Sequence, residues 1–421
     1  MLNALQWFVD LGSIVVLPIL IFIFGLILGT KPGKAFTSAL TVGVGFVGLN
    51  LTTIDVGWPA AAAISYGTIL GSLAIPIGVV LNVVLIIFGL TKTLNVDIWN
   101  IWHAAFISSL VYALTGNFAM GIAATVIYLM MILLMGDILG PIINKFYGFP
   151  NITFPHGTAA PGFVFALPMN WLFDRIPGLR DWKADPESIQ KRFGVFGDST
   201  VMGFLIGLII GILAGYDVAG TGQLAVKTGA VMVIMPKMVA LLMEGLTPIS
   251  ESANDFVKKR FPGRELYIGM DAALSVGHPA VLSSSLLLVP ITILLAVVLP
   301  GNTTLPFGDL ATIPFLVCLM AAVFGGNIIR TVIAGTIYMT SILYITSWVA
   351  PLVTTAAKSA NFDLQGNSTI TALAEGGLWT TWLYVGLTKV LSWGGLAIIG
   401  AIVVIGLIYV NKVLPKKQSV M

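Results

Sequence analysis

The segment Ile152–Phe163, ITFPHGTAAPGF, places polar and helix-breaking residues inside an otherwise apolar stretch. Pro155 and Pro161 each remove a backbone hydrogen bond and disfavour a continuous helix. Unpaired backbone groups at membrane depth are tolerated where they face protein or a water-filled cavity, and such broken segments hold polar substrates. An imidazole and a hydroxyl at the break can exchange hydrogen bonds or protons with a substrate. We therefore expect His156 and Thr158 to line a substrate cavity.

A second polar region follows later in the chain. Gly269–Ser285, GMDAALSVGHPAVLSSS, contains Asp271 and His278, and Pro279 breaks the helix directly after the histidine. An ionisable side chain is expensive to place in an apolar setting and marks a functional site by default. We predict that Asp271 and His278 contact the substrate.

Four other residues are weaker candidates. The segment Gly245–Asn254, GLTPISESAN, is a further predicted break, and it adds Thr247 to the predicted substrate contacts. In IDVGWPA, Asp55 is another ionisable contact, and Trp58 either stacks on a sugar-like ring or chain or marks the membrane interface. His103 is as well explained by a hydrogen bond to a neighbouring helix as by a functional role.

The amino-acid composition indicates the environment of these broken segments. Only 9% of the residues are charged, against about 25% in soluble domains, while 57% are apolar and the mean hydropathy is +0.99. The sequence therefore predicts an all-α polytopic membrane protein with about ten or eleven transmembrane helices and with broken or re-entrant segments. The net charge is only +3 and the basic residues lie in loops between the spans, so the charge gives no indication of nucleic-acid binding.

Nine apolar runs and two weaker ones are predicted to span the membrane. The nine are Ile14–Thr30, Ile75–Leu90, Ala119–Met135, Val201–Gly215, Leu224–Leu242, Leu282–Leu299, Ile313–Phe324, Thr331–Trp348 and Leu391–Val410, and the two weaker runs are Phe36–Val56 and Trp102–Leu114. In one of them Gly203, Gly207, Gly211 and Gly215 recur every four residues, which predicts close packing against another helix.

Two interrupted segments in corresponding positions indicate an inverted-repeat transporter. PHG at Pro155–Gly157 is answered by GHP at Gly277–Pro279. We expect a single transmembrane domain, residues 1–421, made of two inverted repeats that cover roughly residues 1–195 and 196–421.

Basic residues set the expected orientation. They concentrate in Asp174–Arg192, in Asp255–Glu265 and in the C-terminal tail, whereas the residues before the first span contain no Lys or Arg. Because short cytoplasmic loops carry the excess of Lys and Arg, we expect the N-terminus outside and the C-terminus inside.

The single cysteine, Cys318, lies in the apolar run IPFLVCLMAAVF. One cysteine excludes a disulfide framework within the chain and any CxxC metal or redox site. We expect this thiol to be inert, because its surroundings disfavour a thiolate. No cofactor and no metal site are predicted.

Several motifs resemble the galactitol-type membrane subunit, IIC, of the bacterial phosphoenolpyruvate-dependent sugar phosphotransferase system, within the ascorbate–galactitol superfamily. The similarity extends from about Leu11 to Val410. The motifs are VDIWNIWH (Val96–His103), PHGT (Pro155–Thr158), KRFGVFGD from Lys191, GLIIGILAGYDV (Gly207–Val218), QLAVKTGAVM, GLTPI and LPFGDLATI (Leu305–Ile313).

The resemblance implies a polyol permease of the bacterial inner membrane, multi-pass and surrounded by lipid. Its substrate would be phosphorylated by a partner IIB subunit that carries a phosphocysteine, with IIA upstream. Kinship with the ascorbate permeases implies a core domain beside a dimerising scaffold, hence a homodimer with elevator-like movement. Phosphorylation of a hydroxyl requires its deprotonation, and either His156 or Asp271 is the candidate general base.

Two points leave the substrate and the mechanism open. The family resemblance leads us to expect a longer segment before the DVGWP motif than Leu49–Ile54, so pentitols compete with galactitol as substrates. A proton-coupled secondary transporter of a polyol or sugar would use the same intramembrane His and Asp as its relay. An intramembrane hydrolase is disfavoured, because neither HExxH nor GxSxG occurs in the sequence.

Overall fold

The structure is a computed structural model. It describes residues 13–52, 61, 64–65, 68–97, 99–182, 184–187, 195, 199–213, 215–260, 266–306, 308–362, 364 and 368–414. The chain in these ranges is mainly helical, as the sequence predicts.

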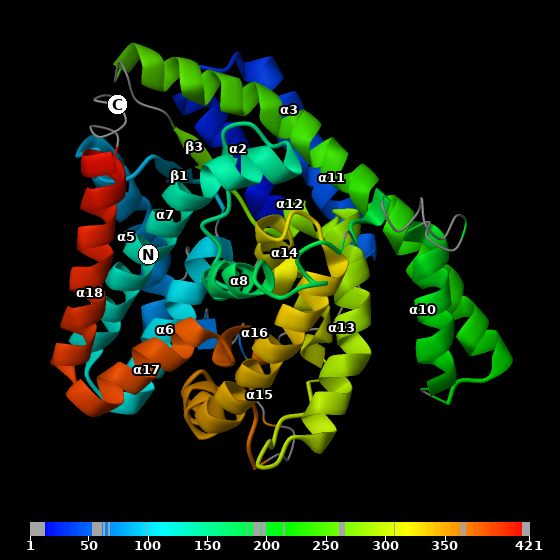
Figure 1. Ribbon diagram of the computed structural model, residues 1–421. Coiled ribbons are helices and arrows are strands. Elements are labelled where there is room, and N and C mark those ends of the chain that lie inside the picture. The colour runs from blue at the N-terminus through cyan, green and yellow to red at the C-terminus, as the bar shows by residue number, and fades with distance from the viewer. Residues whose placement is uncertain are drawn as a thin grey trace.

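Long helices alternate with short ones and with three very short strands (Figure 1). The elements are α2 (Ser13–Ile27), α3 (Pro32–Thr52), α5 (Ile69–Ile87), β1 (Thr93–Asn95), α6 (Trp99–Thr115), α7 (Phe118–Tyr147), β2 (Ile152–Thr153), α8 (Ala160–Phe173), α10 (Ser199–Leu213), α11 (Val218–Arg260), β3 (Tyr267–Gly269), α12 (Ala273–Val276), α13 (Pro279–Val298), a 3-10 turn η2 (Gly308–Thr312), α14 (Ile313–Val323), α15 (Ile328–Ser359), α16 (Leu373–Gly376), α17 (Trp379–Leu391), α18 (Trp393–Ile408) and a π-turn η3 (Tyr409–Val413).

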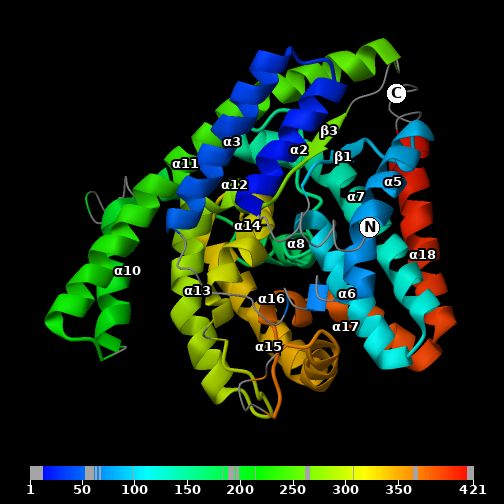
Figure 2. The ribbon, with the colours of Figure 1, turned by 180° about the vertical axis from the view of Figure 1, so that it is seen from behind.

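The helices form two packed groups and an arm. One group contains α5, α6, α7, α17 and α18, and the other contains α8, α13, α14 and α15. The arm consists of α2, α3, α10 and α11, in which α11 packs against both α3 and α10. In Figures 1 and 2, α10 and the first part of α11 stand out from the side of the molecule.

The predicted close approach of the glycine-striped helix is confirmed. A Cβ atom at Gly207 would come within 2.8 Å of the Ala225 Cα atom, and one at Gly211 within 3.0 Å of the Thr221 Cα atom. Without side chains on this face of α10, α11 approaches to backbone contact.

Each of the eleven predicted spans overlaps a helix within the described residues. Within the described residues, five helices are long and apolar enough to cross a membrane: α5, α7, α13, α15, and α18 with its π-turn. Three shorter apolar helices accompany them, at Ala160–Phe173, Gly203–Ile212 and Ile313–Val323. The protein is therefore an all-α polytopic membrane protein.

The predicted break at Gly245–Asn254 is wrong, because α11 runs without interruption to Arg260. Gly245 faces α3 so closely that a Cβ atom there would lie 2.8 Å from the Ser38 carbonyl oxygen. Packing of α11 along α3 therefore stabilises a helix through a segment whose glycine and proline alone disfavour it.

A small parallel sheet is the main feature that the sequence did not reveal. Its strands lie in the order β1-β3-β2, with Leu94 and Ile152 both in register with Ile268. Backbone bonds continue beyond the strands, from Val96 N to Gly269 O and from Met270 N to Thr153 O. The sheet thus pairs backbone groups that the helix breaks leave free.

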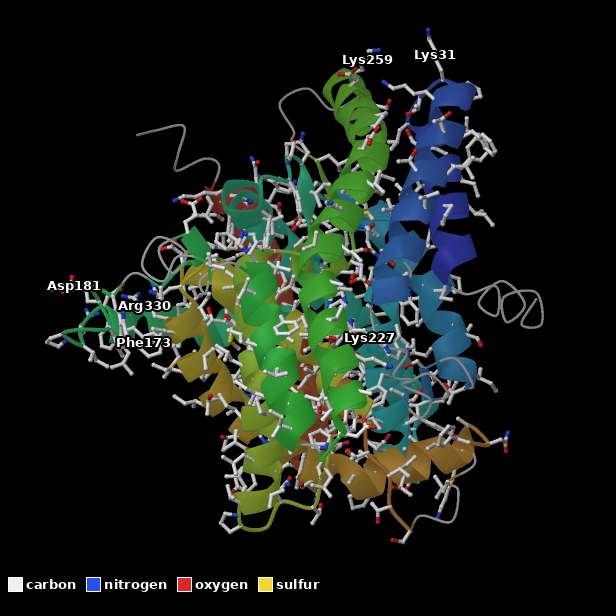
Figure 3. The ribbon with its side chains drawn as sticks, turned by 90° about the vertical axis from the view of Figure 1, so that its right-hand side faces the viewer. Lys31, Phe173, Asp181, Lys227, Lys259 and Arg330 are labelled. Atoms are coloured by element: carbon white, nitrogen blue, oxygen red, sulfur yellow. The ribbon has the colours of Figure 1, made fainter. Side chains whose placement is uncertain are left out.

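Labelling from outside the cell tests the orientation. Lys31 and Lys259 lie at the same end of the molecule (Figure 3), and the turn between α13 and α14, which contains Thr303, lies at the opposite end (Figure 1). Because the basic end is expected in the cytoplasm, an impermeant thiol reagent should label Thr303→Cys in intact cells. It should label Lys259→Cys only after permeabilisation. The wild type, whose Cys318 is fully buried, is the blank, and the reverse pattern would overturn the orientation.

Candidate functional site

Three parallel strands deliver three ionisable side chains to one edge of the sheet. Asp97 follows β1, Asp271 follows β3 and His156 follows β2, each within three residues of the strand end. Because the carboxyl ends of parallel strands meet at the same edge, side chains far apart in the sequence come together there. Asn100 strengthens this arrangement, since its amide donates to the Met270 carbonyl oxygen at 3.3 Å and ties α6 to the end of β3.

Two histidines and two carboxylates form the centre of the site. The His156 Nε2 atom lies 3.3 Å from the Asp271 Oδ1 atom, and the His103 Nδ1 atom lies 2.6 Å from the Glu375 Oε1 atom. The imidazole rings meet edge to face with centroids 4.7 Å apart. All four residues are at most 8% exposed. We call this group the histidine–carboxylate cluster.

The cluster joins the two halves of the sequence. Both histidines precede residue 195, and both carboxylates follow residue 196, so each imidazole has a carboxylate partner from the other half. Removing one partner of a buried polar pair leaves the other without a hydrogen-bond partner, which is costly in the interior. The two pairs therefore hold the halves together as well as forming the site.

The broken segment after β2 fits tightly around the cluster. The Thr158 hydroxyl donates to the Glu375 Oε1 atom at 3.5 Å, at the long limit of a hydrogen bond. Phe315 stacks on the His156 ring with centroids 5.7 Å apart. A Cβ atom at Gly157 would lie 2.4 Å from the Tyr128 hydroxyl and 2.5 Å from the His103 Cγ atom. Glycine is required here because His103 and Tyr128 both press against the backbone.

Glu375 is positioned by a second break in the chain. It lies in the four-residue helix α16, between a polar loop and α17. The Asp309 carboxylate accepts a hydrogen bond from the Leu373 amide at 2.6 Å, and the Thr381 hydroxyl donates to the Glu375 carbonyl oxygen. Both bonds hold the backbone on either side of Glu375, so the carboxylate stays directed at His103.

Some polar atoms of the site have no partner among the described residues. His103 Nε2, His156 Nδ1 and Asn100 Oδ1 are buried and make no hydrogen bond there. Buried polar atoms in native proteins are paired in the large majority of cases. Such a concentration around one cluster is consistent with a polar ligand that supplies the missing bonds.

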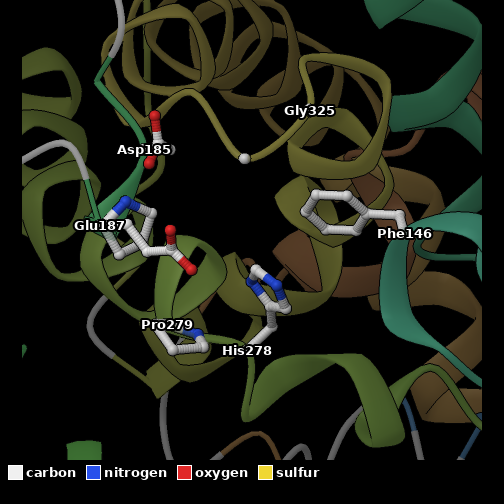
Figure 4. A pocket seen from close by; sticks show the side chains of 8 residues that line it. Phe146, Asp185, Glu187, His278, Pro279 and Gly325 are labelled. Carbon is white, nitrogen blue, oxygen red and sulfur yellow. The ribbon is translucent and has the colours of Figure 1, made fainter.

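His278 lies in a different place from the cluster. It caps α13, where its Nδ1 atom accepts a hydrogen bond from the Ala280 amide at 3.2 Å, and its ring contacts Phe146. Figure 4 shows it in an open pocket of about 320 Å³, with Asp185 and Glu187 on the side opposite Phe146. The structure thus does not bring His278 together with His156, and its contact with substrate stays a prediction.

The other predicted contacts divide into two groups. His156, Thr158 and Asp271 come together in the structure. Asp55 and Trp58 lie outside the described residues, and Thr247 lies in α11 with a side chain that is outside the description.

Sequence reasoning missed Glu375 and left His103 undecided. His103 sits in the regular helix α6, where no proline or glycine indicates a break. Glu375 had a usable signal, because ALAEGGLW places one carboxylate beside two glycines before an apolar helix. Within the described part of the chain, no group of three or more His, Cys, Asp or Glu residues is arranged to hold a metal ion.

Comparison with known proteins gives the family. The family model described as the sugar-specific permease component of the phosphotransferase system matches residues 7–54 and 50–367. The chain belongs to this family. The two matched pieces meet at residues 50–54, in the connection that the sequence shows to be short.

Relatives of known description cover almost the whole chain. The galactitol-specific EIIC components of Escherichia coli K12 and of Escherichia coli O157:H7 are each 40% identical over 429 residues, which covers 96% of this chain and 95% of the relative. A putative permease IIC component of Escherichia coli K12 is 34% identical over 430 residues and covers 96% of both chains. With its five long apolar helices, the protein is a multi-pass protein of the inner membrane.

Replacing Gly157 should disable the site. In Gly157→Ala the new methyl group collides with His103 and Tyr128, so we expect at least a tenfold loss of substrate uptake with a lower yield of extracted protein. Gly222→Ala is the matched control, because no atom lies within 4 Å of a Cβ at that position. Uptake by radiolabel and yield from detergent measure both effects. Wild-type uptake in Gly157→Ala would show that the cluster does not serve transport.

Proposed function

We propose that this protein is the permease of a phosphotransferase system for a galactitol-like polyol, which moves the substrate inward for phosphorylation by a partner IIB subunit. The observation that carries the proposal is the histidine–carboxylate cluster, which lies at the breaks in the helices. The galactitol-specific function of two relatives at 40% identity supports the same substrate class.

The chemistry of the cluster suits a polyol. A polyol is uncharged and every carbon bears a hydroxyl group, so its site needs neutral donors and acceptors in close succession. Two imidazoles, the hydroxyl of Thr158 and two carboxylates supply these groups within a buried space. We assign His156, Asp271 and Thr158 to substrate binding, with His156 or Asp271 as the base that deprotonates the hydroxyl to be phosphorylated.

The phosphoryl carrier must lie on another protein. Cys318 is fully buried, and its thiol donates to the Phe315 carbonyl oxygen at 3.2 Å. A group so enclosed cannot take a phosphoryl group from a second protein. We place the docking of IIB, with IIA upstream, on the basic end that contains Lys31 and Lys259.

We also propose that the chain consists of two inverted repeats, with α18 added at the end. In this pairing α2, α3, α5, α6, α7 and α8 correspond to α10, α11, α13, α14, α15 and α17. The first residues of α5 and α13 are 210 positions apart in the sequence. Pro141 in α7 and Pro351 in α15 are separated by the same 210 positions. The GHP motif then corresponds to the start of α5, and His156 corresponds to Glu375. This pairing of the repeats replaces the pairing of PHG with GHP that the sequence suggested.

Local structure supports this pairing. Asn117 caps α7 and Asn327 caps α15, each through its side-chain oxygen and a backbone amide three residues on. Inside these helices, Tyr128 and Tyr338 occupy equivalent places and both are fully buried. The pairs have the same spacing of 210 positions as the helix starts.

The packing of helices also supports two interlocked repeats. α6 of the first repeat contacts α15 and α17 of the second, and α14 of the second repeat contacts α7 and α8 of the first. Each contact thus has a counterpart with the halves exchanged. Among the paired helices that the structure describes, five precede PHGT in the first repeat and five precede α16 in the second. An odd number of crossings in the first repeat would turn the second repeat over in the membrane.

The arm is our candidate for a dimerising scaffold. α10 carries exposed apolar residues, among them Ile209 at 55% and Ile212 at 63% exposure. In a homodimer these side chains would face a second subunit or lipid, while the remaining helices move as the core of an elevator.

A proton-coupled transporter is the second candidate, because buried imidazole–carboxylate pairs also suit a proton relay. The chemical state of the accumulated substrate separates the two. Cells that express the protein with its partner should take up labelled galactitol and convert it to a phosphate ester, and deletion of the partner should stop both. Proton-driven accumulation of free polyol without the partner would favour the rival function.

The site assignment has its own test in the same cells. His156→Ala removes the ring that pairs with Asp271 and contacts His103, so uptake should fall at least tenfold while membrane insertion persists. Asp181→Asn is the control, because the Asp181 side chain is exposed and pairs with Arg180 and not with a residue of the cluster. Uptake above about half the wild-type level would remove His156 from the site.

Replacement of the cysteine tests the location of the carrier. Cys318→Ser is nearly isosteric and keeps a donor for the Phe315 carbonyl oxygen, so phosphorylating uptake should stay within about twofold of wild type. Measurement of the labelled phosphate ester gives the result. A loss of phosphorylation with uptake intact would instead place the carrier on Cys318.

A further inference from the structure

Each imidazole of the histidine–carboxylate cluster has one nitrogen beside a carboxylate and one nitrogen away from it. In His103 the Nδ1 atom lies 2.6 Å from the Glu375 Oε1 atom but outside hydrogen-bond geometry, and Nε2 has no partner among the described residues. In His156 the Nε2 atom faces Asp271 at 3.3 Å, and Nδ1 has no partner there. The two rings touch, so both free nitrogens belong to one small region.

The carboxylates decide what the free nitrogens can do. A carboxylate accepts hydrogen bonds, so the imidazole nitrogen beside it carries the proton. In a neutral ring the other nitrogen is then an acceptor. Glu375 and Asp271 thus fix complementary tautomers, proton on Nδ1 in His103 and on Nε2 in His156.

We propose that His103 Nε2 and His156 Nδ1 accept hydrogen bonds from two neighbouring hydroxyl groups of the polyol, with Glu375 and Asp271 as positioning residues that fix the tautomers. The proposal rests on the proposed polyol function and adds to it how the substrate is read. His103 and Glu375 thereby become half of the recognition site, although the broken segments indicated His156 and Asp271 but neither of these two.

Paired acceptors give a definite selectivity. The two imidazole nitrogens bind O–H donors on adjacent carbons. When a carbonyl replaces one hydroxyl, the carbonyl oxygen faces an imidazole nitrogen, and two acceptors cannot form a hydrogen bond. A buried acceptor whose partner is missing costs affinity, and sites built for hydroxyls therefore reject analogues that lack one. The order of preference should be alditol over the matching keto compound.

Monodeoxy analogues of galactitol test the two contacts separately. Galactitol is meso, and a chiral site distinguishes its two ends, so both enantiomers of the 1-, 2- and 3-deoxy compounds are needed to cover all six positions. In competition with labelled galactitol, analogues lacking either of two adjacent hydroxyls should bind the wild type about tenfold more weakly, or about 1.4 kcal/mol. In Glu375→Gln the amide can donate to Nδ1 and reverse the tautomer, so discrimination at one of these carbons should disappear. Asp271→Asn should remove it at the other.

Two further variants keep the test decisive. Glu375→Asp retains a carboxylate and should keep the wild-type discrimination, which separates loss of charge from loss of fold. Asp181→Asn changes an exposed carboxylate that pairs with Arg180 and not with an imidazole, and should leave both yield and discrimination unchanged. Equal weakening of galactitol and every analogue in Glu375→Gln and Asp271→Asn would overturn the proposal. No binding of galactitol by the wild type would instead refute the proposed function.

Discussion

The need to pair every backbone group inside a membrane shapes the centre of this protein. Lipid offers no hydrogen bonds, so a helix can be broken only where protein or a polar ligand satisfies the freed groups. Here the three-stranded sheet pairs much of that backbone, from Val96 to Gly269 and from Met270 to Thr153. The strands are only two or three residues long. They suffice because they lie where three chain segments leave their helices, and their shared direction sends Asp97, Asp271 and His156 to the same edge.

Buried polar contacts outside the cluster keep that centre in place. Asp137 of α7 accepts hydrogen bonds from Thr91 before β1, from Thr93 in β1, and from Asn411 in the π-turn η3 after α18. In the second half, Ser347 of α15 bonds to the loop at Asn302–Thr304 in the same way. α7 thus anchors the connection between α5 and α6, and α15 anchors the connection between α13 and α14. A substitution at Asp137 acts on the position of β1, and through β1 on the site.

The sequence was informative where chemistry and chain breaks coincide. PHGT and GMDAALSVGHP marked His156, Thr158 and Asp271, because a proline or glycine beside an ionisable residue has few explanations in an apolar chain. His103 gave no such signal, since it lies in an unbroken helix. The strands were too short for any alternation to show. The predicted break at Gly245–Asn254 failed because the long contact between α11 and α3 outweighs local propensity, which only the packed structure reveals.

The site is chemically asymmetric although its framework is nearly symmetric. If His156 and Glu375 occupy equivalent places in the two repeats, the same broken segment supplies a proton acceptor ring in one half and a carboxylate in the other. Each of these two residues has its partner in the opposite half, because His156 faces Asp271 and Glu375 faces His103. Each histidine depends on the opposite half for the carboxylate that orients it. A complete site therefore exists only when both halves are folded and in contact, and relative movement of the halves would change both pairs together.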